Sequence, residues 1–242
     1  MDTDVLVIGA GPVGLTLAMD LATRGIDVTV VEMRHRGEPP SVKCNHVAAR
    51  SMEIFRRLGV SRRVREAGLP PEYPHDIAFR TTMTGREITR IPIPSRSRRY
   101  TDTTGADAGW PTPEPPHRIN QIFLEPILFE HAAGMDHVIM LNRTELVHID
   151  QHEDGIDATV RDLETSERMT ITAQYLVGCD GARSIVRRLI GAKLEGDAVV
   201  QRVQSTHIRA SQLLKLLRDA PAWGNISLNP RRSGTVYAID GR

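Results

Sequence analysis

The stretch VLVIGAGPVGLTLAMDLATRGIDVTVVE at residues 5–32 decides the fold of the first part of the chain. It starts with an apolar run at 5–8, of the kind found in parallel strands that are buried on both faces. A glycine-rich turn at 9–14 follows, and apolar residues then recur at helical spacing until Gly25. A second apolar run ends at Glu32. The stretch therefore predicts a strand, a turn, a helix and a second strand in one unit.

Three glycines of the turn, in the pattern GxGxxG, have separate physical tasks. Gly9 permits the tight turn out of the strand, and Gly11 leaves room for a pyrophosphate against the backbone. Gly14 lets the helix pack closely on the strand. The helix N-terminus offers free N–H groups and the positive end of its dipole to phosphate oxygens. The turn thus predicts an adenine-dinucleotide site, and a turn that only packs a helix is the structural alternative.

Glu32 stands at the end of the second strand, where a carboxylate can accept hydrogen bonds from ribose hydroxyls. Its negative charge disfavours the 2′-phosphate of NADP and leaves NAD or FAD. Arg34 and Arg36 follow directly and weaken that discrimination. The fingerprint alone therefore does not separate NAD from FAD.

Composition and charge restrict the class of protein. The 242 residues carry a net charge of +1, 40% are hydrophobic and only 4% are aromatic, so we expect a globular core of aliphatic side chains. The balanced charge argues against a nucleic-acid partner, and no apolar run reaches the roughly 20 residues of a membrane span. Cys44 and Cys179 are too few for a disulfide framework and lack neighbours at metal-ligand spacing. We therefore expect no metal site. No secretory signal precedes the first strand, so we expect a cytoplasmic protein.

The remaining sequence alternates between helical and strand patterns. Helical spacing predicts helices at 48–58, 62–67, 124–133, 184–190 and 211–218. The third of these should begin near Pro126, because proline is tolerated only in the first turn of a helix. Strands are predicted within a hairpin at 75–93 and at 143–150, 155–161, 167–173, 175–179, 198–209, 225–229 and 234–239. A long loop is expected at 94–118.

Three further segments match a known family in order and spacing. RSMEIFRRLG at 50–59 resembles an R-x-x-E-x-L-x-x-L-G helix, Gln121-x-x-Leu124-Glu125 follows, and CDGARSIVR at 179–187 resembles a C-D-G-x-x-S-x-V-R motif. The family is that of FAD-dependent aromatic hydroxylases, the single-component flavoprotein monooxygenases related to para-hydroxybenzoate hydroxylase and the polyketide hydroxylases. The resemblance covers residues 1 to about 191. Residues 192–242 resemble its substrate-domain strands only loosely.

The resemblance implies roles for individual residues. Arg50 would hydrogen-bond the FAD pyrophosphate or ribityl region, which suits a fixed guanidinium fork, and Gln121 would contact the ribityl chain. Asp180 would lie near the FAD ribose and pyrophosphate, and its motif is also linked to the reduced nicotinamide cofactor. Arg187 would support that motif by pairing with Asp180 or with a phosphate. The expected cofactor-binding residues are Gly9, Gly11, Pro12, Val13, Gly14, Glu32, Met33, Arg34, Arg50, Gln121, Asp180, Gly181 and Arg187.

Several of these residues also have a purely structural interpretation. Arg50 could lie on a solvated helix face, Gln121 could cap its helix, and Asp180 with the following glycine is a common turn pair. Cys179 is expected to be a small buried apolar residue. The arginines within 96–99 are expected on a solvated loop, with contact to a pyridine nucleotide or a substrate phosphate as the alternative.

One motif of the family has no counterpart in this sequence. The family carries a second FAD signature of the type GDAAH, but Gly196-Asp197 lacks the following Ala-Ala-His and Asp240-Gly241 is reversed. We therefore expect the N-terminal portion of a longer hydroxylase, or a truncated relative. The flavin-ring site and much of the substrate pocket would lie outside it.

The predicted fold class is α/β. A Rossmann-like parallel sheet for FAD would carry antiparallel crossover strands, and a partial antiparallel sheet would belong to the substrate domain. Residues 1–74 and 105–191 are assigned to the FAD-binding domain, and residues 75–104 and 192–242 to the partial substrate-binding domain.

The function implied by the resemblance is hydroxylation of a small aromatic, phenolic compound with FAD, NADH or NADPH, and dioxygen. The cofactor carries this chemistry, so no catalytic side chain is assigned. A homodimer is left open, and no nucleic-acid or membrane partner is expected.

A non-catalytic FAD-binding fragment is one alternative. A second is an NAD-dependent dehydrogenase, which leaves the Arg50 and Asp180 segments unexplained. A lipid-epoxidising flavin enzyme would bring a membrane-facing apolar segment, and the sequence has none.

Overall fold

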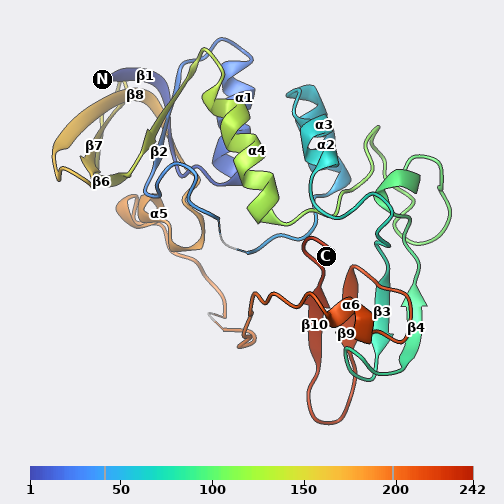
Figure 1. The fold of residues 1–242 in the computed structure, drawn as a ribbon. Coiled ribbons are helices and arrows are strands. Elements are labelled where there is room, and N and C mark those ends of the chain that lie inside the picture. Colours follow the sequence, from blue (N-terminus) through green and yellow to red (C-terminus); the bar gives the residue numbers. More distant parts are fainter. Residues whose placement is uncertain (41, 198, 242) are drawn as a thin grey trace. The chain divides into compact units, whose positions relative to one another are not determined.

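The computed structural model describes residues 1–40, 42–197 and 199–241 (Figure 1). The chain divides into two compact units. The first unit consists of Met1–Pro40 and Glu125–Gln204, and the second of Ser41–Leu124 and Ser205–Arg242. In the described part of the chain, no helix combines the length and the apolar character needed to cross a membrane.

A six-stranded sheet with the order β5-β2-β1-β8-β7-β6 forms the first unit. Its strands are β1 (Asp2–Ile8), β2 (Val28–Glu32), β5 (Val138–Asn142), β6 (Thr144–Gln151), β7 (Ile156–Asp162) and β8 (Arg168–Gly178). The pairings β5–β2, β2–β1 and β1–β8 are parallel, whereas β8–β7 and β7–β6 are antiparallel. The predicted α/β class, with a parallel sheet and antiparallel crossover strands, is confirmed.

Strand β8 joins the parallel and antiparallel halves of this sheet. Residues 168–173 pair with β7, and the strand pairs with β1 from Thr172 to Gly178. The two strands predicted at 167–173 and 175–179 are therefore one continuous strand, because the ladder to β1 continues past Gln174. Strand β5 was not predicted from the sequence, and it is separated from β6 only by Arg143, a residue in the left-handed region with φ of 55°.

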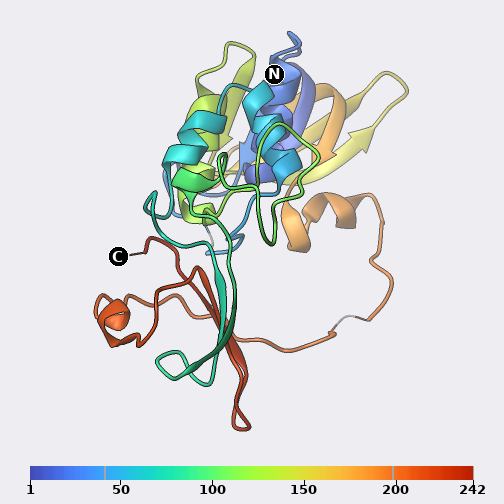
Figure 2. The same cartoon turned by 90° about the vertical axis from the view of Figure 1, so that its right-hand side faces the viewer.

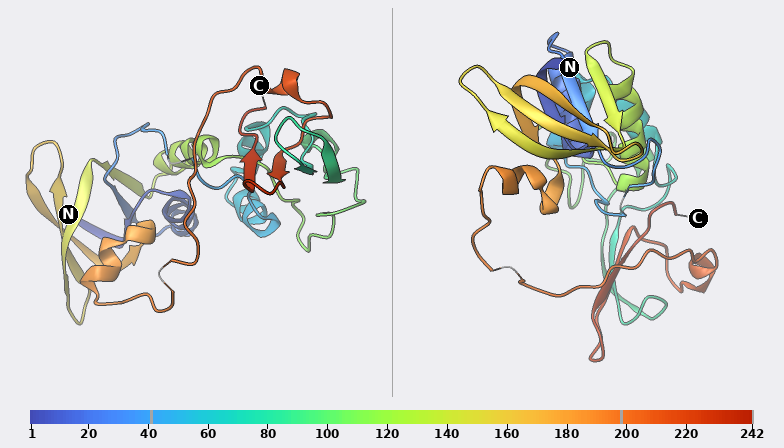
Figure 3. Two further views of the ribbon diagram at one scale, coloured as in Figure 1. Left: turned by 90° about the horizontal axis from the view of Figure 1, so that it is seen from below. Right: turned by 90° about the vertical axis from the view of Figure 1, so that its left-hand side faces the viewer.

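The core of the first unit lies on both faces of the parallel strands. Leu6 and Val31 pack with Leu146 of β6 and Val160 of β7, so the antiparallel strands cover one face of the parallel ones (Figure 3). Side chains alternate along a strand, so Val7 points to the opposite face. On that side α1 (Pro12–Ala22) packs against β1, β2 and β5. Helix α5 (Ile185–Leu189) contacts β6 and β8 instead, and its Val186 belongs to the core on the Leu6 face.

Helix α4 (Gln121–Ala133) begins ahead of Pro126, so the predicted start near that proline is wrong. Asn120 starts the helix instead, because its Oδ1 accepts the N–H of Ile122 at 3.0 Å. Pro126 therefore lies inside the helix on an exposed face. Without an N–H it cannot donate to the carbonyl of Ile122, one turn earlier.

The second unit contains a four-stranded sheet with the order β10-β9-β3-β4 (Figure 2). Its strands are β3 (Ile77–Arg80), β4 (Glu87–Ile91), β9 (Gly224–Ser227) and β10 (Gly234–Tyr237). The hairpin β3–β4 is antiparallel, as predicted, and the strands β9 and β10 also pair in antiparallel fashion. The pairing that joins them, between β3 and β9, is parallel, so the sheet as a whole is mixed.

Short helices and long irregular segments complete the second unit. Its helices are α2 (Ala49–Arg57), α3 (Ser61–Glu66) and α6 (Leu213–Leu216). The predicted loop at 94–118 is confirmed apart from a single 3-10 turn at Arg96–Arg98. The predicted strand at 198–209 is wrong for residues 199–209. These residues form no strand, and their apolar side chains are exposed. Residue 198 lies outside the described residues.

The compact units group the chain differently from the predicted functional domains. Residues 42–74 and 105–124 belong to the second unit together with its strands, whereas the sequence analysis assigned them to the FAD-binding domain. Packing defines a compact unit, and ligand contacts define a functional domain, so the two need not coincide. The assignment of 1–74 and 105–191 to FAD binding, and of 75–104 and 192–242 to substrate binding, stays a prediction. Residues 41, 198 and 242 within these ranges lie outside the described residues.

We expect Pro126→Ala to raise the free energy of unfolding by about 1–3 kcal/mol, because alanine restores a donor inside α4. Chemical unfolding followed by circular dichroism measures the change. Leu128→Ala, at a fully buried position of the same helix, serves as the opposite control and should lose about 2–5 kcal/mol. A Pro126→Ala protein that is less stable than the wild type would contradict the expectation.

Candidate dinucleotide-binding site

Two glycines of the β1–α1 turn are required by the protein's own backbone. Gly9 has φ of 105°, and a Cβ added to it would lie 2.6 Å from the carbonyl oxygen of Cys179. A Cβ on Gly14 would lie 2.0 Å from the carbonyl oxygen of Gly9. Such distances cannot be accommodated without moving backbone. Gly9 and Gly14 therefore hold the end of β1, the start of α1 and the end of β8 in close contact.

Gly11 differs from both. Its φ of −75° and ψ of 177° are accessible to any residue, and an added Cβ would have no heavy atom of the described chain within 4 Å. Internal packing thus gives no reason for a glycine at this position. The backbone is open where the sequence analysis placed a pyrophosphate, so Gly11 fits a ligand that approaches the main chain.

The N-terminus of α1 begins at this open position. Among the described residues no side chain caps the helix at Gly11, and Pro12 at its first position has no N–H. The N–H groups of Val13 and Gly14 precede the first intrahelical hydrogen bond, which Leu15 donates to the carbonyl of Gly11 at 3.0 Å. The Val13 side chain is 71% exposed. This arrangement fits the phosphates of a dinucleotide.

Glu32 ties the end of β2 to the glycine turn. Its Oε2 accepts the N–H of Ala10 at 2.8 Å, and its two oxygens accept the backbone N–H, Nε and Nη2 of Arg34 at 3.0, 3.0 and 3.2 Å. Burial opposes ionisation of this carboxyl, but the hydrogen bonds from Arg34 and Ala10 outweigh it and hold the pKa of Glu32 below its ordinary value. A ribose at this carboxylate has to share its oxygens with Arg34.

Arg34 links Glu32 to a second carboxylate. Its Nη1 lies 2.6 Å from Oε1 of Glu125, a buried residue of α4, and the two carboxylates raise the pKa of the guanidinium. Glu125 lies in one of the matched motifs but was not predicted as a site residue. A signal existed, because a carboxylate flanked by apolar helix positions needs a cationic partner. Met33 lies between the two paired residues and is exposed.

Asp180 follows β8, and its carboxylate binds the first N–H groups of α5, whose N-cap residue is Ser184. Its carboxylate accepts hydrogen bonds from the Ser184 hydroxyl at 2.6 Å and from the N–H groups of Ile185 and Val186 at 2.6 and 3.2 Å. Gly181 has φ of 73°, which favours glycine. Arg187 donates to the carbonyl of Ala182 at 3.0 Å. The hydrogen bonds to α5 account for Asp180 structurally, and its contact with a cofactor stays a prediction.

The first unit brings most of the predicted residues to one edge of its sheet. The carboxyl ends of β2, β1 and β8 are adjacent there, which is where open α/β sheets bind ligands. This edge carries Gly9, Gly11, Pro12, Val13, Gly14, Glu32, Met33, Arg34, Asp180 and Gly181, and Arg187 follows in α5.

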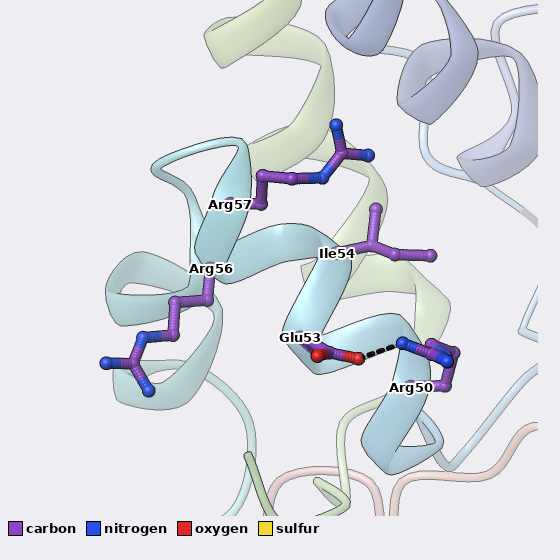
Figure 4. A pocket seen from close by; sticks show the side chains of 5 residues that line it. All are labelled: Arg50, Glu53, Ile54, Arg56 and Arg57. Carbon is purple, nitrogen blue, oxygen red and sulfur yellow. Dashed lines mark hydrogen bonds and ion pairs between the residues drawn. The ribbon is translucent and has the colours of Figure 1, made fainter. Parts of the chain in front are cut away.

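Arg50 and Gln121 belong to the second unit. The Arg50 side chain is 75% exposed and forms an ion pair with Glu53 on the same helix, α2. Figure 4 shows the two side chains facing each other beside a hollow lined by Arg50, Glu53, Ile54, Arg56 and Arg57. Gln121 starts α4, and its N–H donates to the carbonyl of Cys44 at 3.0 Å. Three arginines and one carboxylate line this hollow, and Arg56 also forms an ion pair with Glu114 at 3.7 Å.

The arginines within 96–99 do not share one environment. Arg98 is exposed, as predicted for a solvated loop, but Arg99 is only 2% exposed, so the prediction is wrong for Arg99.

His117 is buried, and its backbone pairs with that of Val47. Cys179 is half-buried, and burial raises the pKa of its thiol. The described residues contain no group of three or more His, Cys, Asp or Glu side chains placed to hold a metal ion.

A family model described as "FAD binding domain" matches residues 2–241. The chain belongs to this FAD binding domain family. Among curated relatives, the phenol 2-monooxygenase of Pseudomonas sp. (strain EST1001) is 31% identical over 222 residues, which cover 91% of this chain and 35% of the relative. Aklavinone 12-hydroxylase DnrF of Streptomyces peucetius subsp. caesius is 35% identical over 239 residues, covering 99% of this chain and 47% of the relative.

Solved structures agree with these matches. The rebeccamycin biosynthetic enzyme RebC with reduced flavin has a TM-score of 0.82 and 33% identity, over 100% of this chain and 45% of RebC. The flavin-dependent monooxygenase PieE, in complex with FAD and substrate, has a TM-score of 0.80 at 24% identity, which shows the shared fold. The resemblance to flavoprotein monooxygenases and hydroxylases is confirmed. The chain spans less than half the length of the relatives named here.

We expect Glu32→Gln to reduce the stability of the FAD-binding chain most above about pH 5, and progressively less at lower pH. The folded carboxyl has a lowered pKa, so its charged form contributes stability that is present above the unfolded value and lost as the pH falls through the folded value. Urea unfolding between about pH 7 and about pH 3 measures the difference. Glu153→Gln, in an exposed hairpin turn, is the control. A Glu32→Gln deficit that does not change with pH would contradict the expectation.

Proposed function

We propose that the chain binds FAD, with the pyrophosphate held by the β1–α1 turn and the ribose held by Glu32. The observation that carries this proposal is Gly11, a glycine that neither packing nor backbone conformation requires, in front of an uncapped helix N-terminus. Both features suit a diphosphate. The match to the FAD binding domain family supports FAD over NAD and counts against the NAD-dependent dehydrogenase alternative.

Further contacts to FAD are proposed for residues of the matched motifs. Arg50 is exposed and retains donors beside its ion pair with Glu53, so it can bind the pyrophosphate or ribityl oxygens. Gln121 is proposed to contact the ribityl chain. The Asp180–Gly181 turn, supported by Arg187, is proposed to lie near the ribose and pyrophosphate, with Pro12, Val13, Met33 and Arg34 completing the set.

We further propose that the protein carrying this chain hydroxylates an aromatic, phenolic compound, with NADH or NADPH as reductant and dioxygen as co-substrate. Bound FAD supplies the activation of oxygen and its transfer to the ring. The residues of this chain bind and orient the cofactor and exclude water around it. The relatives of the chain support the proposal, because they include phenol 2-monooxygenase and 2,4-dichlorophenol 6-monooxygenase, the latter 32% identical over 81% of this chain.

A non-catalytic FAD-binding fragment is the second candidate, because no side chain of the described residues is assigned a catalytic role. This candidate shares the FAD site and differs only in turnover. A cytoplasmic location and a homodimer stay predictions.

We expect the purified chain to retain flavin absorbance in the visible spectrum after incubation with FAD and desalting. The uncapped α1 N-terminus and the open backbone at Gly11 provide the physical reason. A colourless protein that takes up no FAD under any condition would sink the FAD proposal. Uptake of FAD without NADH- or NADPH-driven oxygen consumption in the presence of phenols would favour the non-catalytic candidate.

We expect Gly11→Ala to weaken FAD binding by about tenfold or more, because a Cβ occupies space proposed for the pyrophosphate. Its cost to folding should stay at or below about 1 kcal/mol, since no described atom lies near that Cβ. Flavin fluorescence titration and thermal unfolding measure the two effects separately.

Two glycine variants provide matched controls for Gly11→Ala. Gly234→Ala, at an open position of β10, should change neither FAD affinity nor stability. Gly14→Ala should destabilise the fold itself, because its Cβ meets the Gly9 carbonyl. Unchanged FAD affinity in a folded Gly11→Ala protein would contradict the placement of the pyrophosphate at this turn.

A further inference from the structure

The second unit contains a buried pair of arginines outside the residues assigned to FAD. The side chains of Arg99 and Arg118 are 3% and 7% exposed. Each donates through Nη2 to the same oxygen, Oδ2 of Asp107, at 2.9 Å, and Arg99 also donates to the Asp107 carbonyl at 2.6 Å. One carboxylate therefore serves two buried guanidinium groups.

Several donors of this pair lack an acceptor. Within the described residues, Nε and Nη1 of Arg99 and Nε of Arg118 are buried without a hydrogen-bond partner, and so is Nε2 of His75. Burial, together with the nearby Arg118, lowers the pKa of His75 to about 3, so its imidazole adds no charge at neutral pH. Buried charged donors without partners are costly. The cluster thus has a surplus of positive charge and free capacity for an anionic acceptor.

An aromatic ring lies against each guanidinium. Cζ of Arg99 is 5.0 Å from the ring centroid of Trp110, and Cζ of Arg118 is 4.4 Å from that of Trp223. The Trp223 ring in turn lies 4.8 Å from that of Tyr237. Two guanidinium forks match the planar geometry of a carboxylate, and the rings offer contact to an aromatic body. These are the two tryptophans of the chain, so tryptophan fluorescence reports on this cluster.

The carboxylate that the arginines hold belongs to a strained loop residue. Asp107 has φ of 61°, and its side chain is 33% exposed. Non-glycine residues keep such a conformation only where surrounding contacts hold it. Gly105, with φ of 83°, and Gly109 flank Asp107 and give the segment freedom to adopt another conformation.

We propose that Arg99 and Arg118 form a carboxylate-binding site whose internal occupant is Asp107, and that an aromatic carboxylate binds there by displacing Asp107. The displaced side chain, already partly exposed, moves into solvent, and the ligand carboxylate takes over the two Nη2 donors. The free donors of Arg99 and Arg118 then strengthen the new pair. This inference does not rest on FAD binding, because every residue in it belongs to the second unit.

The test is a titration of the 242-residue chain with benzoate, followed by tryptophan fluorescence in the absence of added FAD. We expect a saturable change with benzoate and none with benzamide, its neutral counterpart of similar shape. Asp107→Asn removes the internal competitor and should lower the Kd for benzoate by about fivefold or more. Arg99→Gln and Arg118→Gln should each raise it by about tenfold or more.

Arg98→Gln is the matched control. Arg98 is a neighbouring but exposed arginine paired with Asp102 at 2.8 Å, so its loss should leave the Kd for benzoate unchanged. Equal effects of Arg98→Gln and Arg99→Gln, or an Asp107→Asn protein that binds benzoate no better than the wild type, would overturn the proposal. If inorganic phosphate binds to this site as tightly as benzoate does, the assignment of the site to carboxylates would be overturned.

A second measurement avoids the dependence on Asp107→Asn, which removes the shared counter-ion and could unfold the chain. Benzoate should raise the thermal unfolding midpoint of the wild-type chain, and benzamide should not. Equal midpoints in benzoate and benzamide would overturn the proposal without any variant. Failure of FAD uptake, by contrast, leaves both measurements intact, so the two proposals fail independently.

Discussion

The close approach of three backbone segments, at Gly9, Gly14 and Cys179, is the constraint on which the first unit depends. A single Cβ at either glycine would overlap a carbonyl oxygen. Because these positions stay bare, β1, α1 and β8 meet at one edge of the sheet. The hydrogen bond from Ala10 to Glu32 then adds the end of β2. Gly11 lies between Gly9 and Gly14, which are both tightly packed, whereas its own backbone has open space beside it. A ligand can therefore approach the main chain at Gly11.

The two arginine clusters have opposite charge balance. Arg34 lies between two carboxylates, Glu32 and Glu125, and each acid finds its partner inside the protein. Arg99 and Arg118 instead share a single carboxylate and keep buried donors unused. A satisfied network rigidifies the region around it, whereas an unsatisfied one has more to gain from a ligand. The first cluster therefore stabilises the edge of the sheet proposed to bind the cofactor. The second cluster can gain hydrogen bonds when a ligand binds.

Sequence patterns correctly predicted those elements that are determined by interactions between residues close in sequence. The strand, turn, helix and strand at 5–32 were predicted correctly, because glycine spacing and apolar runs act within a few residues. The single long β8 and the missed β5 depend on β1 and β2, strands distant in sequence, which no local pattern contains. Pro126 shows a different limit, because the nearby cap from Asn120 starts α4 ahead of the proline. The motif residues could be named from the sequence, but the partnership of Arg34 with Glu125 needed the folded chain.

The parallel pairing of β1 with β8 has a consequence for synthesis of the protein. Residue 5 pairs with residue 175, so one edge of β1 stays unpaired until almost the whole of the first unit has left the ribosome. Throughout that time the nascent chain exposes an apolar strand edge that can pair with other chains. Contacts of such long sequence separation also form slowly once the chain is complete. Translation of this domain is therefore an interval of aggregation risk.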